Sequence, residues 1–220
     1  MPVYRTVVWD MDGVLVDSER HWSDTEDFFL KEALPDWDEF DESLLVGRSL
    51  SDVYTLLSRD YGLSMSEEEF HRKYNERAKE IYSEHAELMP NAEFVLQSLS
   101  GEGVRQVLAS SSTHEWIGYA MERFGVDRYF ELIVSADDVA GKGKPAPDIY
   151  EYVCHRIKEP KGRILVVEDS GPGMEAAHAA GLDVALYPSQ GNSTEGRITE
   201  VEFLIHDLLE ILLIQQGSEG

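Results

Sequence analysis

An apolar run gives way to acidic residues in TVVWDMDG, residues 6–13. The β-branched and aromatic side chains before the acids predict a short buried strand. Asp10 and Asp12 follow at its end, and Gly13 permits the close backbone approach that an anion cradle needs. A second apolar run ends in the same way in ILVVEDS, residues 164–170. Buried strands that end in acids predict a polar site at one edge of a parallel sheet.

Strand and helix patterns alternate through most of the chain. The expected strands are 6–9, 104–109, 132–134, 164–167 and 184–186. The expected helices are 92–99, 115–124, 147–157, 174–180 and 205–213. This order predicts an α/β fold: a Rossmann-like parallel sheet with helices on both faces and a site beyond the carboxyl ends of its strands.

The segment 18–89 breaks this alternation. Acidic and aromatic residues recur there at helical spacing, and no strand signal interrupts them. We expect three or four amphipathic helices, the last running from about Ser66 to Glu87 and starting with a capping box. The chain therefore divides into a catalytic core of residues 1–17 and 90–220 and an inserted α-helical cap domain.

The composition limits where the protein works and what it binds. The 220 residues carry 43 acidic side chains against 19 lysines and arginines, a net charge of −24. Such a surface repels polyanions, so we expect no binding to nucleic acid or to an anionic membrane. There is no long apolar run, no secretory leader is expected, and a single cysteine, Cys154, excludes an intrachain disulfide. We expect a cytoplasmic protein that is a monomer or a small homo-oligomer.

The strand ends and one loop carry the side chains that suit chemistry. Carboxylates from two strands form a hard, oxygen-rich site that suits Mg²⁺. Lys144, in the loop GKGKP, and the Ser110 hydroxyl suit a phosphoryl group. An aspartate such as Asp10 can attack phosphorus, and a second carboxyl two residues on, Asp12, can protonate the leaving oxygen. We therefore expect metal-dependent phosphoryl chemistry at this edge.

Four motifs of this chain resemble those of the haloacid dehalogenase (HAD) superfamily and follow in the same order. They are DMDGVLVDS at 10–18, VLASSS at 107–112, GKPAPD at 143–148 and VVEDSGPG at 166–173. One short acidic motif is weak evidence, whereas four in order at strand ends and loops are hard to ascribe to chance. The helical insert after the first motif is similar to the type-1 cap of β-phosphoglucomutase and of small sugar-phosphate and phosphoglycolate phosphatases.

The resemblance implies roles for four acids. Asp10 would be the nucleophile and a Mg²⁺ ligand, and Asp12 would be the general acid and base and bind the metal through its backbone carbonyl. Asp169 would bind Mg²⁺, with Glu168 as a further ligand or as its support. The implied reaction is Mg²⁺-dependent hydrolysis of a small phosphate monoester, such as a sugar phosphate, through an aspartyl phosphate. The implied partner is a small phosphorylated metabolite.

The resemblance also implies which residues hold the substrate. Lys144, Ser110, Ser111 and Gly13 would bind the phosphoryl group during its transfer. Two cap residues are candidates for contact with the rest of the substrate, Arg48 and His21.

A mutase of the β-phosphoglucomutase type is the alternative that the resemblance leaves open. That mutase has a cap histidine where this chain has Trp22, with His21 one residue early, and a cap arginine where this chain has Leu50. These departures favour a phosphatase. A dehalogenase would leave Asp12 without a role, and a phosphonatase would need a distinctive cap lysine. A non-catalytic protein of this fold would lack the nucleophile, the acid or the lysine, all of which this chain has.

Overall fold

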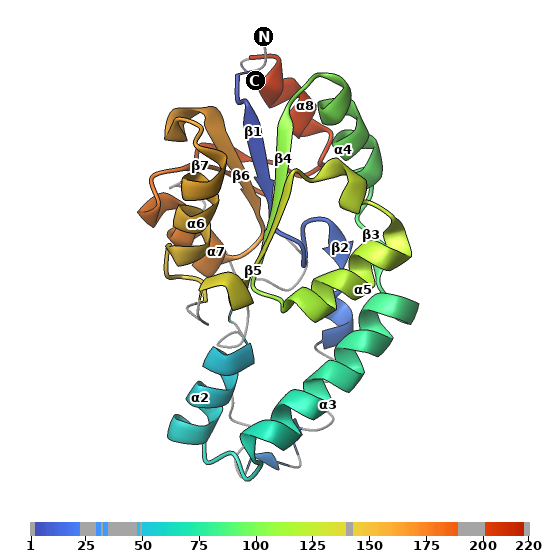
Figure 1. Cartoon of the computed structure of the whole chain (residues 1–220), viewed down its shortest axis with the longest axis vertical. Coiled ribbons are helices and arrows are strands. Elements are labelled where there is room, and N and C mark those ends of the chain that lie inside the picture. The colour runs from blue at the N-terminus through green and yellow to red at the C-terminus, as the bar shows by residue number, and fades with distance from the viewer. Residues whose placement is uncertain are drawn as a thin grey trace.

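The computed structural model describes residues 3–22, 30–31, 33–34, 48, 50–139, 143–188 and 201–217. Its centre is a six-stranded sheet in the order β5-β4-β1-β6-β7-β8 (Figure 1). The strands are β1 (Thr6–Trp9), β4 (Arg105–Ser110), β5 (Leu132–Ser135), β6 (Ile164–Glu168), β7 (Asp183–Leu186) and β8 (Phe203–Leu204). Every pairing in this sheet is parallel, which confirms the expected α/β, Rossmann-like fold.

The first strand, β1, lies inside the sheet between β4 and β6. Its residues Val7, Val8 and Trp9 are fully buried, because helices cover both faces of the sheet. Val7 and Trp9 pack in one apolar cluster and Val8 packs in the other, as the alternation of side chains along a strand requires. Asp10, the next residue, therefore leaves the sheet in the middle of its carboxyl edge.

Helices cover the sheet in two groups (Figure 1). The helices that pack with Val8 are α6 (Asp148–Ile157) and α7 (Gly171–Ala179). The helices that pack with Val7 and Trp9 are α4 (Ala92–Gly101), α5 (His114–Phe124) and α8 (Glu210–Gln215). Short 3-10 helices are η4 (Asp127–Tyr129), η5 (Ala136–Val139) and η6 (Lys161–Arg163). Within the described residues, no helix has both the length and the apolar character to span a membrane.

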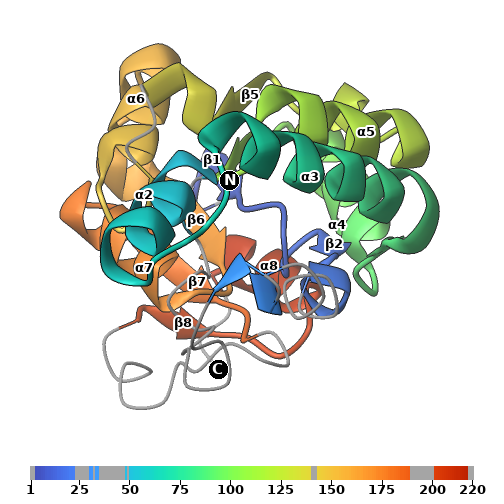
Figure 2. The ribbon, with the colours of Figure 1, turned by 90° about the horizontal axis from the view of Figure 1, so that it is seen from below.

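The described part of the expected cap holds α2 (Leu50–Asp60), α3 (Glu67–Glu80) and a π-helical turn, η3 (Ile81–His85). Both α2 and α3 lie beyond the carboxyl edge of the sheet, α2 on the side of α6 and α7 and α3 beside α5 (Figures 1 and 2). The Ser66 hydroxyl accepts a hydrogen bond from the backbone N–H of Glu69, which confirms the expected N-cap. Residues 23–29, 32, 35–47 and 49 of the expected cap, and any expected helix there, lie outside the described residues.

A small antiparallel pair joins the two chain segments that lead into and out of this helical part. The strands are β2 (Val16–Asp17) and β3 (Glu87–Leu88), with Val16 opposite Leu88. We keep the division of the chain at residues 18 and 89 as a proposal.

Three expected elements differ from the structure. The helix expected at 205–213 starts later than expected, since α8 begins at Glu210, and the short strand β8 before it was not expected. The cap helix expected to reach Glu87 is α-helical only to Glu80, after which come η3 and β3. Glu168 is the last residue of β6 and does not follow the strand. Strands of two residues are too short to show an alternating pattern, so β3 and β8 have no signal in the sequence.

Candidate active site

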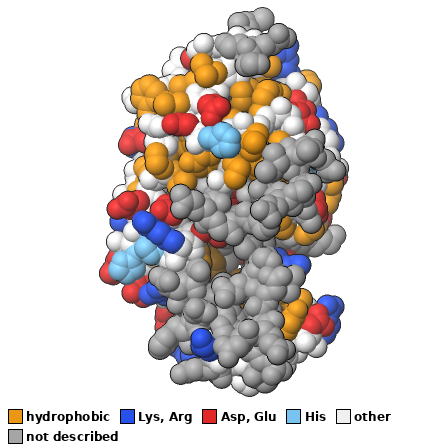
Figure 3. All heavy atoms as spheres, turned by 180° about the vertical axis from the view of Figure 1, so that it is seen from behind, with side chains coloured by type: hydrophobic (Ala, Val, Ile, Leu, Met, Phe, Trp, Pro, Cys, Tyr) orange, Lys and Arg blue, Asp and Glu red, His pale blue; other side chains and the backbone are white. Residues whose placement is uncertain are grey.

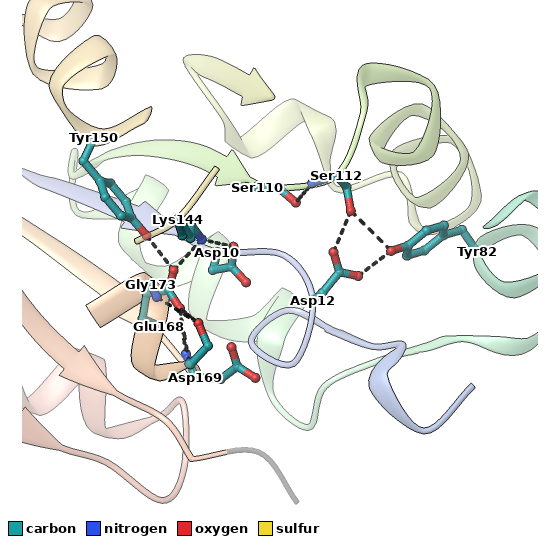
Figure 4. Close-up of polar contacts among 11 residues, drawn as sticks. Asp10, Asp12, Tyr82, Ser110, Ser112, Lys144, Tyr150, Glu168, Asp169 and Gly173 are labelled. Atoms are coloured by element: carbon teal, nitrogen blue, oxygen red, sulfur yellow. Dashed lines mark hydrogen bonds and ion pairs between the residues drawn. The ribbon is translucent and has the colours of Figure 1, made fainter. Parts of the chain in front are cut away.

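The carboxyl edge of the sheet brings Asp10, Lys144 and Glu168 into direct contact (Figure 4). Asp10 follows β1 and Glu168 ends β6, and these strands are neighbours, with Trp9 opposite Val167. Lys144 Nζ lies 2.6 Å from Asp10 Oδ1 and also contacts Glu168 Oε1. All three side chains are buried, so one ammonium group faces two carboxylates that are removed from water.

Glu168 holds this arrangement together because both of its carboxylate oxygens accept hydrogen bonds. Tyr150 Oη donates to Oε1 at 2.7 Å, and Ser170 Oγ donates to Oε2 at 3.1 Å. The backbone N–H of Asp169 donates to Oε2 at 3.2 Å. These donors offset the cost of burying a carboxylate that is 0% exposed. With both oxygens engaged, Glu168 fixes Lys144 beside Asp10.

Two glycines allow the backbone to come close to the acids. Gly13 has φ +79°, and a Cβ atom built there would overlap with the Asp169 carboxylate. A Cβ atom at Gly173, near the start of α7, would overlap with the Glu168 carboxylate. Any larger residue at either position would therefore displace an acid of the site.

The site has more negative than positive charge. Burial raises the pKa of the Asp10 carboxyl well above its usual range; Lys144 opposes this shift, and Glu168 adds to it. Burial disfavours the charge of Lys144, but Asp10 and Glu168 outweigh it and raise the pKa of the lysine well above its usual value. The ammonium group therefore stays charged, and a further cation would be stabilised at this edge.

Three acids could hold such a cation. Ligand oxygens of Asp10, Glu168 and Asp169 all lie within 4.8 Å of one another, and all three residues are buried. Carboxylate oxygens are the ligands that Mg²⁺ takes in proteins. The donor chemistry and excess negative charge of this acidic cluster fit a hard divalent cation of that kind.

Asp12 points away from the acidic cluster, toward the hydroxyl groups of Tyr82 and Ser112 (Figure 4). Its Oδ1 accepts hydrogen bonds from Ser18 Oγ and from Tyr82 Oη, both at 2.6 Å. Its Oδ2 accepts a hydrogen bond from Ser112 Oγ at 2.9 Å. Burial and the Asp12 carboxylate raise the pKa of the Tyr82 hydroxyl well above its usual value, so it remains a donor at neutral pH. Asp12 is thus held by donors from separate parts of the chain.

A cavity of about 120 Å³ lies between the carboxyl edge of the sheet and the helices beyond it. The core residues that line it are Asp10, Asp12, Ser111, Ser112, Thr113, Trp116, Lys144, Asp169 and Ser170. The residues that line it from the segment 18–89 are Glu19, Trp22, Arg48, Leu50, Val53, Tyr74 and Tyr82. The wall opposite the acids is thus largely aromatic and apolar, with Glu19 and Arg48 as its charged members among the described residues.

Most of the residues expected at the site line this cavity; those that do not are Gly13, His21, Ser110 and Glu168. Successive helical residues point about 100° apart. In the helical turn 19–22, Trp22 faces the cavity, so His21 does not; its ring lies 5.9 Å from that of His85. Ser110 is 1% exposed, and its Oγ accepts a hydrogen bond from the backbone N–H of Ser112 at 3.0 Å. In the serine run, Ser111 and Ser112 line the cavity in place of Ser110. The substrate contacts expected of His21 and Ser110 stay predictions.

Sequence reasoning missed Tyr82, Ser112 and the aromatic wall. The sequence partly indicated Ser112, because it stands in a run of hydroxyl residues after a strand. The run does not reveal which of these hydroxyls faces Asp12. Tyr82 had no such signal, since it reads as one more apolar position of an amphipathic helix. Trp116 likewise reads as a core residue of α5, and its ring stacks on Trp22 with the centroids 5.0 Å apart.

Comparison with known proteins gives one family. The family model described as haloacid dehalogenase-like hydrolase matches residues 7–187. The chain is 31% identical over 216 residues to a bifunctional riboflavin kinase/FMN phosphatase of Arabidopsis thaliana. That match covers 96% of this chain and 55% of the relative, so this chain spans about half of that protein's length.

A second relative matches over most of its own length. The chain is 31% identical over 194 residues to a probable pseudouridine-5'-phosphatase of Drosophila melanogaster, which covers 86% of this chain and 83% of the relative. Among solved structures, the fold is similar to that of CbbY from Rhodobacter sphaeroides in complex with phosphate, with a TM-score of 0.80. That likeness covers 97% of this chain and 99% of the other at 22% identity, and it shows the fold alone.

Proposed function

Because the chain belongs to the haloacid dehalogenase-like hydrolase family, we propose that it is a Mg²⁺-dependent phosphatase of small phosphate monoesters, sugar phosphates or similar metabolites. The observation on which this proposal rests is that Asp10, Asp12 and Lys144 line the same cavity. A buried carboxylate, a second carboxylate with hydroxyl partners and a buried ammonium group are the parts that phosphoryl transfer through an aspartate requires.

In the first step, a carboxylate oxygen of Asp10 attacks phosphorus, and the bond from phosphorus to the leaving oxygen breaks. Asp12, protonated for this step, gives its proton to the leaving oxygen. In the second step, Asp12 takes a proton from water, which attacks the aspartyl phosphate and releases phosphate and a free Asp10 carboxylate. The sum is one monoester and one water converted to one alcohol and one phosphate.

The charge that develops on the phosphoryl oxygens needs donors beside Asp10. Lys144 Nζ lies 2.6 Å from Asp10 Oδ1, and this closeness to the nucleophile supports its assignment as a donor to those oxygens. We assign Ser110, Ser111 and Gly13 to the same phosphoryl site, with the Ser111 side of that loop lining the cavity.

Mg²⁺ would be held by Asp10, Asp169 and Glu168, together with the backbone carbonyl of Asp12. When bound, Mg²⁺ supplies a positive charge that stabilises the phosphoryl oxygens. Glu168 also keeps its own role as the acceptor that fixes Lys144.

The cavity wall supports hydrolysis over the mutase alternative. Trp22 lines the cavity at the position where the mutase has a histidine. Arg48 is the cation of the described part of the cap that lines the cavity, and we assign it to the leaving group. We further propose a cytoplasmic monomer or small homo-oligomer, which the acidic composition and the single cysteine support.

A phosphate-release assay tests the function. Wild-type protein should hydrolyse p-nitrophenyl phosphate with Mg²⁺ and lose this activity in EDTA. Asp10→Asn should reduce turnover by a factor of about 10⁴ or more, because the amide cannot form the phosphoenzyme. Asp60→Asn, which changes an exposed acid of α2, is the matched control and should keep wild-type activity.

The same assay over sugar phosphates, flavin mononucleotide and pseudouridine 5'-phosphate should identify the preferred leaving group. Substantial turnover by Asp10→Asn would overturn the nucleophile assignment. Formation of glucose 6-phosphate from β-glucose 1-phosphate at a rate above phosphate release would replace the phosphatase by the mutase.

A further inference from the structure

Asp12 receives a hydrogen bond from each of the two chain segments that connect the core to the helices beyond the sheet. Ser18, just after β2, donates from the outgoing segment, and Tyr82, in η3 just before β3, donates from the returning one. Ser112 donates from the core loop after β4 (Figure 4). The side chain that we assign as the acid is therefore set by the position of the helical part as well as by the core.

The indole of Trp22 fixes which hydrogen bond the Tyr82 hydroxyl donates. The indole N–H of Trp22 can only donate, and it lies 3.3 Å from Tyr82 Oη. Tyr82 Oη must accept that bond, so its own proton goes to its other close partner, Asp12 Oδ1, at 2.6 Å. Ser112 Oγ, 3.5 Å from Tyr82 Oη, is much farther from it. A chain of hydrogen bonds thus runs from Trp22 through Tyr82 to Asp12.

The Tyr82 ring has little freedom to move. Its side chain is 0% exposed, and its ring packs edge-on against Trp22 with the centroids 6.2 Å apart. It lies in a π-helical turn, a rare form that is frequent at functional sites. Arg123 of α5 donates to the backbone carbonyl of Tyr82 at 3.4 Å, which ties this turn to the core.

We infer that Tyr82 is a positioning residue that holds the Asp12 carboxylate in the orientation needed to protonate the leaving oxygen. The inference rests on the proposed function, since it assigns Tyr82 a task within that reaction. The packed ring and the directed proton make Tyr82 a fixed donor, whereas the Ser18 and Ser112 hydroxyls can rotate. Without the Tyr82 hydroxyl, the Asp12 carboxyl group would sample other orientations. The rate of proton transfer from Asp12 to the leaving oxygen would then decrease.

Two aryl phosphates that differ in the acidity of the leaving phenol separate this role from a structural one. Phenol is a much poorer leaving group than p-nitrophenol, so phenyl phosphate depends more on the proton from Asp12. Tyr82→Phe should lower the ratio of kcat/KM for phenyl phosphate to that for p-nitrophenyl phosphate about tenfold, a fraction of the 10²–10⁴-fold that a complete general acid contributes. General damage to the protein would lower both rates and leave the ratio unchanged.

Tyr4→Phe is the matched control. The Tyr4 hydroxyl also donates to a carboxylate, Asp183 Oδ2, at 2.8 Å, but neither residue lines the cavity. Its ratio should equal that of the wild type. If Tyr82→Phe does not fold, Trp22→Phe takes its place, because it removes the N–H that directs the Tyr82 proton; it should lower the ratio in the same direction.

The outcomes separate the two proposals. A ratio unchanged in Tyr82→Phe, or in Trp22→Phe where that variant is needed, would overturn the role of Tyr82 while the phosphatase stands. An equal fall of the ratio in Tyr4→Phe would also overturn it. A wild type that hydrolyses neither ester with Mg²⁺ would overturn the proposed function and the role of Tyr82 with it.

Discussion

Gly13 is one of two glycines at which the backbone comes close to an acid of the site. Its φ of +79° is a conformation that side chains rarely adopt, and its missing Cβ leaves the space that the Asp169 carboxylate fills. A single methyl group there would displace the Asp169 carboxylate from its place in the acidic cluster. Gly13 is therefore needed for two reasons: it leaves room for the Asp169 carboxylate, and it adopts the left-handed backbone conformation.

Gly13→Ala should reduce kcat/KM about 100-fold or more, because a misplacement of about 1 Å in a site costs that much. Gly103→Ala is the matched control, since Gly103 has φ +74° but open space where its Cβ would stand. Both variants should lose about 1–2 kcal/mol of unfolding free energy from the left-handed backbone. Steady-state kinetics and urea unfolding would check this. Wild-type activity in Gly13→Ala would contradict the close contact with Asp169.

At the scale of the elements, the junction of β6 and α7 joins the sheet to the acids. Ser170 is the N-cap of α7: its Oγ accepts a hydrogen bond from the backbone N–H of Gly173 at 3.1 Å. The same oxygen donates to Glu168 Oε2 at 3.1 Å. The start of the helix and the end of the strand are thus held by one hydroxyl group. Stability and site geometry are linked at this point.

Ser170→Ala should therefore lower both stability and activity. We expect a loss of about 2 kcal/mol of unfolding free energy, from the N-cap and from the donor that Glu168 loses. We expect kcat/KM to fall about tenfold, because Glu168 fixes Lys144. Thermal unfolding and p-nitrophenyl phosphate kinetics would measure the two effects.

Ser66→Ala removes the N-cap of α3 alone and serves as the comparison. It should cost about 0.5–1 kcal/mol of unfolding free energy and leave kcat/KM unchanged. Equal losses of activity in the two serine variants would show that the Ser170 effect comes from helix capping in general.

At the scale of the whole molecule, the net charge of −24 opposes an anionic substrate. Acidic side chains appear at several separate places on the face shown in Figure 3. Positive charge inside the cavity opposes this repulsion. Among the described lining residues it comes from Lys144 and Arg48. The surface field and the local site therefore act in opposite directions on a phosphate monoester.

The surface field should be visible in the salt dependence. It extends about 30 Å at 0.01 M salt and about 8 Å at 0.15 M. Raising KCl over this range at saturating Mg²⁺ should therefore raise kcat/KM several-fold, because the repulsion of the substrate is screened. The internal control is kcat, which should change less since the substrate is already bound. A fall of kcat/KM with salt would mean that the local cations dominate the approach.

Much of this arrangement could be predicted from the sequence. The runs before Asp10 and Glu168 are continuously apolar because both faces of a parallel sheet are buried. Such runs can be recognised as strands from the local sequence alone. The rule that ligands bind at the carboxyl edge then places their acids on one side of the sheet. The order of the strands, which makes β1 and β6 adjacent, did not follow from those runs.

The hydroxyl partners of Asp12 could not be predicted in the same way. Tyr82 is 70 residues from Asp12 in the chain, and Ser112 is 100 residues from it. Their meeting depends on how η3 packs on α5 and on which way each ring and hydroxyl turns. No periodic pattern records such a contact, since any tyrosine on that face would give the same signal.

The sequence by itself therefore determined the α/β core and the acids and lysine at its edge. The reason is that a strand buried on both faces requires a continuous run of apolar residues, which is visible in the local sequence. Only the tertiary structure decided the aromatic wall, the exclusion of His21 from the cavity and the hydrogen bonds on Asp12. These depend on the direction of side chains from segments far apart in the chain, and that direction is settled when the helices pack.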